Sequence, residues 1–196
     1  MDDVIDFGGA RRHPRAMHLP LDNLLLGQIA GFLALALCVA AVMSKDDDRL
    51  LAVLILGNIA FAVQFAFFGA WVASAISALI ILRIYLARRF PRHLGAALTM
   101  VLATIAVAAA TWQGLPDIFP LAAGIVGTIA MFMFRGIPMR LGLVFAGLCW
   151  IITNALIGSI GALAAETLIL LTNLTTIIRL ARARHRKMAS AVAPDL

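Results

Sequence analysis

The segment Leu50–Leu82, LLAVLILGNIAFAVQFAFFGAWVASAISALIIL, decides the fold, because it runs for 33 residues without a charged side chain. A bilayer core of about 30 Å is crossed by about 20 helical residues, so a single helix of this length is too long for one span. We expect a turn at Phe68-Gly69-Ala70-Trp71, where a glycine stands beside a tryptophan suited to the membrane surface. The segment therefore predicts two membrane-spanning helices joined by a tight hairpin.

The rest of the chain shows the same long uncharged stretches. Leu141–Ile178 contains only Glu166 and is expected to turn at Gly158-Ser159-Ile160-Gly161. Apolar residues surround each stretch on all sides, as in helices that face lipid and one another. The expected fold is an all-α, polytopic transmembrane bundle, in which Leu24–Met43 is a retained span. The predicted spans are 24–43, 50–68, 71–87, 94–112, 118–134, 141–157 and 161–180.

The composition excludes the main alternatives to a membrane protein. The 196 residues are 63% hydrophobic and 13% charged, whereas soluble domains are about 45–50% apolar and about 25% charged. Disordered chains combine low hydrophobicity with high net charge. A net charge of +6 would suit a nucleic-acid binder, but no aromatic platform for bases accompanies the basic residues. We therefore expect the lipid bilayer as a partner and no nucleic acid.

The basic residues predict the orientation. Thirteen Lys and Arg residues lie in the loops after the first, third and fifth spans, at the end of the third span (Arg83) or at the C-terminal end, whereas the turns at 69–71, 113–117 and 158–160 hold none. Cytoplasmic loops are the ones rich in Lys and Arg. We expect a cytoplasmic C-terminus and, with seven spans, an N-terminus on the other side. Arg11, Arg12 and Arg15 depart from this pattern.

Two parts of the chain carry the same series of features. Glycine pairs lie in the first span (Gly27, Gly31) and the fifth (Gly124, Gly127), a hairpin glycine follows each, and each part ends in a helix with a basic exit. Because one linker helix crosses the membrane between the two parts, both parts have the same orientation. Parallel repeats of this kind occur in transporters, whose substrate site lies where the two halves meet. The predicted organisation is an N-terminal tail (1–22), a first three-helix unit (23–91), a linker helix (92–115), a second three-helix unit (116–182) and a cytoplasmic tail (183–196).

The second unit resembles a known family. Leu148–Asn154 (LCWIITN), Gly158–Gly161 (GSIG), Glu166 and Thr172–Arg179 (TNLTTIIR) look like the YgjV-type bacterial inner-membrane proteins. This likeness runs over about residues 24–184 and implies a multi-pass protein of the bacterial inner membrane, so the N-terminus that the charges place outside would lie in the periplasm; it implies no reaction.

The plan of three, one and three helices is also similar to the SWEET and PQ-loop transporters. The Pro-Gln dipeptide of those proteins is absent here. Those proteins are expected to have an asparagine on the third helix of each half. Asn173 stands at this position in the second half, whereas Ile80 or Ser77 stands there in the first half.

Polar side chains inside the spans form the candidate site. Counted from the predicted turns, Gln64, Asn154 and Glu166 form an outer layer. Asn58, Arg83 and Asn173 form a deeper one. We expect Asn154 to be the hydrogen-bond partner of Glu166, and Arg83 to lie too deep to pair with that carboxylate, its side chain able to extend toward the cytoplasm. The candidate substrate-binding residues are Asn58, Gln64, Asn154, Glu166 and Asn173.

These residues leave two functions open. Ionisable groups in spans are costly and usually functional, so Glu166 favours a carrier of a small polar solute by alternating access between the two units. Asn and Gln also hold helices together, and the alternative is a structural or partner-binding membrane protein without transport. We expect no enzyme activity, cofactor or metal site, because the two cysteines and four histidines show no ligand spacing and no nucleophile–base pair is visible.

Overall fold

A computed structural model describes residues 21–43 and 47–192 of the chain, and at 41–43, 47–51 and 184–192 it describes the helices without their side chains. Most of the predicted N-terminal tail (1–22) lies outside the described residues, and so do Lys45 and residues 193–196. The last two residues of that tail open the first helix.

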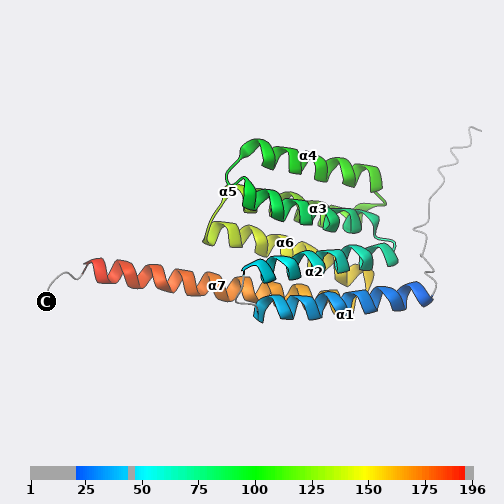
Figure 1. Cartoon of the computed structure of the whole chain (residues 1–196), viewed down its shortest axis with the longest axis horizontal. Coiled ribbons are helices and arrows are strands. Elements are labelled where there is room, and N and C mark those ends of the chain that lie inside the picture. Colours follow the sequence, from blue (N-terminus) through cyan, green and yellow to red (C-terminus); the bar gives the residue numbers. More distant parts are fainter. Residues whose placement is uncertain (1–20, 44–46, 193–196) are drawn as a thin grey trace, which may run out of the picture.

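The described part of the chain is helical, without strands. Six helices are long and apolar enough to cross a membrane, and a further helix contributes a shorter apolar stretch, Ala52–Phe67. The predicted all-α polytopic bundle is therefore confirmed (Figure 1). The elements are α1 (Leu21–Met43), α2 (Asp47–Phe67), α3 (Trp71–Arg89), α4 (Leu94–Thr111), the short 3-10 helix η1 (Leu115–Asp117), α5 (Ile118–Met133), α6 (Ile137–Ile157) and α7 (Ile160–Val192).

Both predicted hairpins occur where an uncharged stretch is too long for one helix. Gly69 separates α2 from α3 with a φ of 69°, and Gly158 ends α6 with a φ of 74°. Such left-handed backbone favours glycine, which has no Cβ atom to clash. The main difference from the predicted spans is the end of α7, which continues to Val192 instead of stopping near residue 180. The residues beyond 180 are rich in Ala, Arg and Lys, which favour a helix without any need for lipid.

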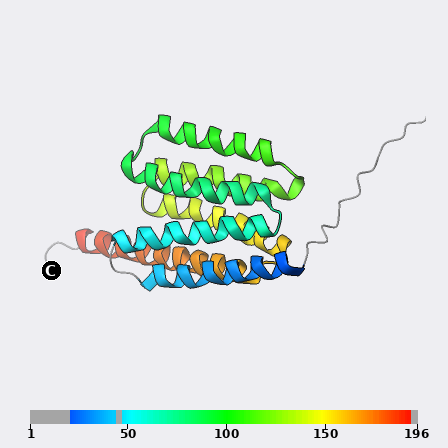
Figure 2. The ribbon, with the colours of Figure 1, turned by 45° about the vertical axis from the view of Figure 1, so that its right-hand side comes forward.

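The helices form two facing layers of three. One layer contains α1, α2 and α3, and the other contains α7, α6 and α5 (Figures 1 and 2). At one edge α1 packs against α7, and at the other α3 packs against α5, so six helices close into a ring. α4 packs on α3 and α5 outside this ring. The two predicted three-helix units thus face each other, whereas their origin as an internal repeat stays a prediction.

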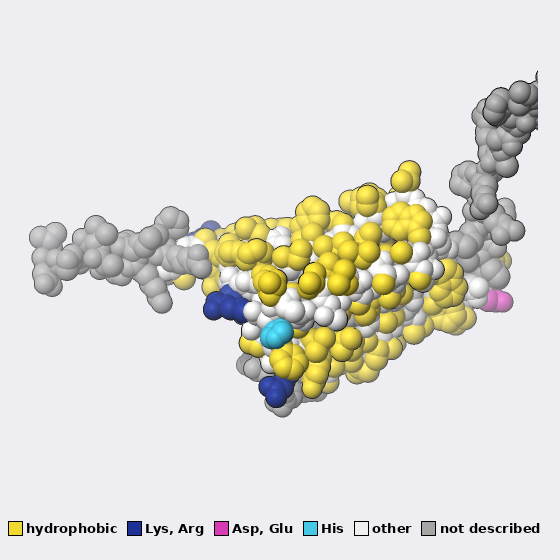
Figure 3. All heavy atoms as spheres, turned by 90° about the horizontal axis from the view of Figure 1, so that it is seen from above, with side chains coloured by type: hydrophobic (Ala, Val, Ile, Leu, Met, Phe, Trp, Pro, Cys, Tyr) yellow, Lys and Arg dark blue, Asp and Glu magenta, His cyan; other side chains and the backbone are white. Residues whose placement is uncertain are grey.

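The two ends of the bundle differ in charge. Lys and Arg side chains gather at one end of the molecule in Figure 3. This end, called the basic end below, includes the end of α3 and the loops α3–α4 and α5–α6, with exposed Arg88, Arg89, Arg92 and Arg135. The opposite end, called the hairpin end, has the turns at 68–70, 112–117 and 158–159, none of which contains a basic residue.

The α1–α7 edge of the ring closes through two glycines. A Cβ atom placed on Gly161 would lie 2.6 Å from the carbonyl carbon of Gly31 and 2.6 Å from the amide nitrogen of Phe32. Both atoms belong to the backbone of α1, so no side-chain rotation could relieve the overlap. Small residues at this position let two backbones approach closely, which is how many membrane helices gain their packing energy.

We predict that Gly161→Ala destabilises the protein by about 1–3 kcal/mol, because the added methyl group must push α7 away from α1. Thermal unfolding of the detergent-purified protein, followed by fluorescence-detected gel filtration, measures the loss. Gly57→Ala is the matched control, since a Cβ atom there would lie 3.9 Å from the nearest atom, Leu37 Cβ. Equal unfolding temperatures for the two variants would contradict the predicted role of the glycine contact.

Candidate functional site

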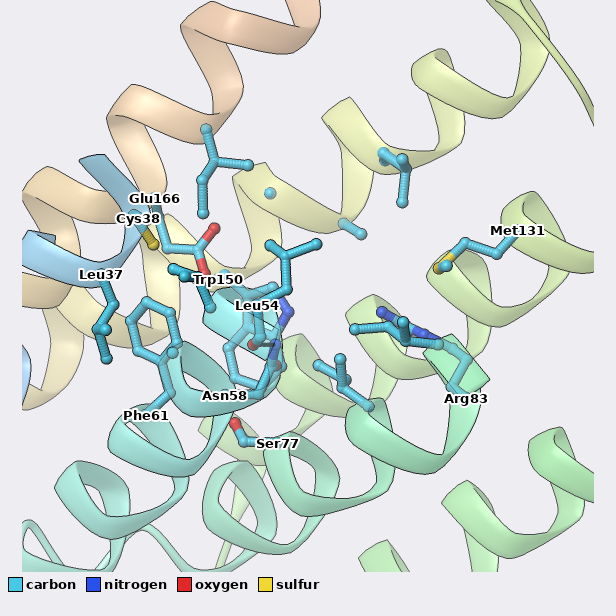
Figure 4. Close-up of a pocket in the computed structure, with 18 of the residues that line it drawn as sticks. Leu37, Cys38, Leu54, Asn58, Phe61, Ser77, Arg83, Met131, Trp150 and Glu166 are labelled. Atoms are coloured by element: carbon cyan, nitrogen blue, oxygen red, sulfur yellow. Dashed lines mark hydrogen bonds between the residues drawn. The ribbon is translucent and has the colours of Figure 1, made fainter. Parts of the chain in front are cut away.

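A central cavity of about 320 Å³ lies between the two layers. All six helices of the ring contribute to its wall, and α4 does not. It extends from Glu166 and Trp150 to Arg88, an exposed residue at the basic end (Figure 4). Aliphatic and aromatic side chains, including Phe61, Phe65 and Trp150, form most of the wall. The polar residues that line it are Asn58, Ser77, Arg83, Arg88, Glu166 and Asn173.

The two asparagines of the cavity are partly engaged with their own helices. Asn58 Nδ2 donates to the carbonyl oxygen of Leu54 at 2.8 Å. Asn173 Nδ2 donates to that of Ile169 at 3.2 Å. Asn173 Oδ1 also accepts a hydrogen bond from Arg140 Nη1 at 3.1 Å, which joins α6 to α7. Sequence reasoning counted Arg140 only as a topological charge, because nothing in the spacing shows that α6 brings it to Asn173.

A second polar group, the polar seal, lies nearer the hairpin end. Gln64 Nε2 donates to Asn154 Oδ1 at 3.2 Å, and Asn154 Nδ2 donates to the carbonyl oxygen of Trp150 at 3.0 Å. Both side chains are 0% exposed. Gly31 leaves space beside them, because a Cβ atom there would lie 2.7 Å from Gln64 Oε1 and 3.1 Å from Ser159 Oγ. These two oxygens make no hydrogen bond within the described part of the chain.

The structure divides the predicted substrate-binding residues into two sets. Asn58, Glu166 and Asn173 line the cavity, whereas Gln64 and Asn154 belong to the polar seal and do not reach it. The expected bond between Asn154 and Glu166 is wrong, because both polar atoms of Asn154 are engaged by Gln64 and Trp150. Glu166 also lies about one helical turn deeper than Asn154 when both are counted from the hairpin. Its carboxylate therefore faces the cavity with the deeper layer.

Arg83 is held inside the bundle. Its side chain is 8% exposed, and Nη1 lies 3.5 Å from the carbonyl oxygen of Gly124 on α5. A Cβ atom on Gly127 would lie 2.6 Å from Nη1, so this glycine makes room for the guanidinium group. The expected extension of Arg83 toward the cytoplasm is therefore wrong. Within the described residues it forms no ion pair with Glu166, as the sequence predicted.

Gln28 is a structural residue that the sequence analysis missed. Its Nε2 donates to the carbonyl oxygen of Gly158 at 2.8 Å, and its Oε1 accepts from the backbone nitrogen of Ile160 at 3.2 Å. One side chain thus satisfies backbone groups at the end of α6 and at the start of α7, where helices leave such groups unpaired. The signal was present, because Gln28 is a polar residue between Gly27 and Gly31 in an apolar span.

Metal and disulfide chemistry receive no support from the described residues. No group of three or more His, Cys, Asp or Glu side chains among them is placed to hold a metal ion. Cys38 and Cys149 are both buried and unlinked. The polar groups on the apolar wall of the cavity are amide, hydroxyl, guanidinium and carboxyl groups.

Known proteins match most of this chain. The family model Imp-YgjV, described as a bacterial inner membrane protein, matches residues 25–184. The chain is 29% identical to the "Inner membrane protein YgjV" of Escherichia coli (strain K12) over 161 residues, which cover 82% of this chain and 87% of that protein. No solved structure matches the chain. The resemblance to the YgjV-type family is confirmed, and the one to SWEET and PQ-loop transporters stays a prediction.

We predict that Gln64→Leu and Asn154→Leu are each destabilising by about 1–3 kcal/mol, because each leaves a buried partner without its hydrogen bond. The double variant should lose less than the sum of the two, since it removes both polar groups. Unfolding in SDS measures the free energies of unfolding of the two single variants and the double variant. It is followed by the fluorescence of Trp150, whose ring stacks on that of Phe65 with the centroids 5.4 Å apart.

Asn58→Leu serves as the control for this cycle, because the amide nitrogen of Asn58 bonds only to its own helix. Its effect should add to that of Gln64→Leu. Simple additivity between Gln64→Leu and Asn154→Leu would contradict the pairing across the seal.

Proposed function

Because the chain belongs to the Imp-YgjV family of bacterial inner membrane proteins, it is a multi-pass protein of the bacterial inner membrane, and we propose that it carries a small polar solute across that membrane. The observation that carries this proposal is the central cavity, whose wall contains residues from both three-helix layers. A solute between two layers can be exposed to either side when one layer tilts against the other. A cavity of about 320 Å³ is at the small end of ligand sites, which suits a small solute.

The residues divide between solute contact and closure. Asn58 and Asn173 contact the solute through amide groups on opposite layers, with Glu166 further toward the hairpin end. Gln64 and Asn154 form a gate, because their hydrogen bond closes the bundle between the cavity and the hairpin end. The Gly31–Gly161 contact closes the same side. To release a solute at the hairpin end, the protein must break the seal and separate α1 from α7.

The basic end faces the cytoplasm in this proposal. Cytoplasmic loops are enriched in Lys and Arg. The exposed Arg88, Arg89, Arg92 and Arg135 all lie at the basic end. The cavity, which reaches Arg88, is then open toward the cytoplasm and sealed toward the periplasm. The C-terminus is cytoplasmic and the N-terminus periplasmic.

We predict that cysteines at positions 58 and 173 react with a membrane-impermeant maleimide in inverted membrane vesicles, because water fills the cavity from the cytoplasmic side. Cys38→Ala and Cys149→Ala first remove the native thiols. Ile59→Cys and Leu174→Cys are controls at matched depth, since both positions are exposed on the outer surface of the bundle, where lipid would cover them. These two should stay unlabelled.

Labelling at 58 and 173 that is as slow as at 59 and 174 would contradict a water-filled cavity. It would favour the alternative, a structural or partner-binding membrane protein whose polar residues hold helices together.

We also predict that green fluorescent protein fused after Leu196 fluoresces in intact cells, because it folds to its fluorescent form in the cytoplasm. Alkaline phosphatase fused at the same point should be inactive, since that enzyme needs the periplasm. Fusions inserted after Gly114 in the α4–α5 loop should give the opposite pair of results. Phosphatase activity at the C-terminal fusion would reverse the proposed orientation.

A further inference from the structure

Two opposite charges line the central cavity without meeting. Arg83 enters from α3 and Glu166 from α7, and Figure 4 shows them on opposite sides of the cavity. No nitrogen of Arg83 lies within 4.0 Å of a carboxylate oxygen of Glu166. Arg83 follows the start of α3 by twelve residues and Glu166 follows the start of α7 by six, so their backbone positions differ in depth by about 9 Å.

Neither charged group is satisfied by the protein around it. Arg83 is buried, its Nε has no hydrogen-bond partner among the described residues, and Nη1 makes a single contact at 3.5 Å. Glu166 is 8% exposed, and its carboxyl group meets the hydrogen-bond criteria with no described residue. A guanidinium group offers five N–H donors, and leaving a buried charge unpaired is costly. The cavity therefore holds a guanidinium group and a carboxyl group, and neither is paired within the described part of the chain.

A solute that carries both charges would satisfy both groups. Its carboxylate would accept hydrogen bonds from the planar guanidinium group, which matches carboxylates well. Its ammonium would donate to Glu166. The solute must span both the difference in depth of the two residues and the width of the cavity between α3 and α7. Asn58 and Ser77 also line the cavity and add polar contacts.

We propose that the solute is a small zwitterion of amino-acid size, with its carboxylate on Arg83 and its ammonium on Glu166; this rests on the proposed carrier function. An anion alone would leave Glu166 unpaired beside it, and an amine alone would leave Arg83 unpaired. The glycine at position 127 belongs to this site, because a larger residue would displace the guanidinium group.

The test is binding to the purified full-length protein in nanodiscs, measured by isothermal titration calorimetry. The probes are glycine, β-alanine, γ-aminobutyrate and 6-aminohexanoate, a series in which the distance between the two charges increases. Each is compared with the carboxylate that lacks its amine and the amine that lacks its carboxylate. We expect at least one zwitterion to bind at least tenfold more tightly than both of its matched analogues.

The variants assign the charges. Arg83→Gln and Glu166→Gln should each weaken binding of that zwitterion at least tenfold, whereas Arg83→Lys and Glu166→Asp should recover part of it. Glu166→Gln should also bind the matched carboxylate as well as it binds the zwitterion, a change in selectivity that a purely structural role would not produce. Arg179→Gln, which removes an exposed charge outside the cavity, should bind like the unaltered protein.

Equal binding of a zwitterion and its matched carboxylate by the unaltered protein would overturn the proposal and indicate an anion carrier. The absence of binding for the whole series would also overturn it. The carrier function itself is judged separately by thiol labelling at positions 58 and 173. A labelled cavity that binds no zwitterion refutes the solute class alone, and an unlabelled cavity refutes both proposals.

Discussion

The closure of the ring at Gly31 and Gly161 is the contact on which the rest of the structure depends. Neighbours in sequence pack within each layer, and in the described part of the chain the layers join at their edges through α1 with α7 and α3 with α5. In a bilayer no hydrophobic force draws helices together, so the α1–α7 edge relies on close backbone packing that side chains would prevent. Opening this edge would expose the central cavity and the polar seal to lipid, where unpaired polar groups are costly.

Polar side chains inside this bundle form two groups at different distances from its two ends. Near the hairpin end they bond to one another or to helix ends, as Gln64 with Asn154 and Gln28 with the α6–α7 turn. Further toward the basic end they line a cavity, where Arg83 Nε has no hydrogen-bond partner among the described residues. The two groups are not fully separated by bonding, because Gln64 Oε1 and Ser159 Oγ have no partner among the described residues, whereas Asn58 and Asn173 in the cavity wall do bond to the protein.

The sequence predicted the helices and turns well, because charge is excluded from the bilayer core and a 33-residue gap must contain a turn. Gly69 and Gly158 could be located on that ground alone. The partners of polar side chains could not be predicted, since they depend on how each helix is rotated about its axis. Asn154 therefore bonds Gln64 on α2 instead of Glu166, and Arg83 lies against Gly127, for which the spacing of glycines gave no partner.

The position of α4 has a consequence for how the protein is made. α4 packs on the outside of the ring and contributes nothing to the cavity wall, so its sequence is constrained by lipid and by α3 and α5 alone. Its single crossing returns the chain to the side on which α1 began, and α5 then enters the bilayer in the same direction as α1. Because both layers enter the bilayer in the same direction, one distribution of Lys and Arg residues is enough to orient each of them.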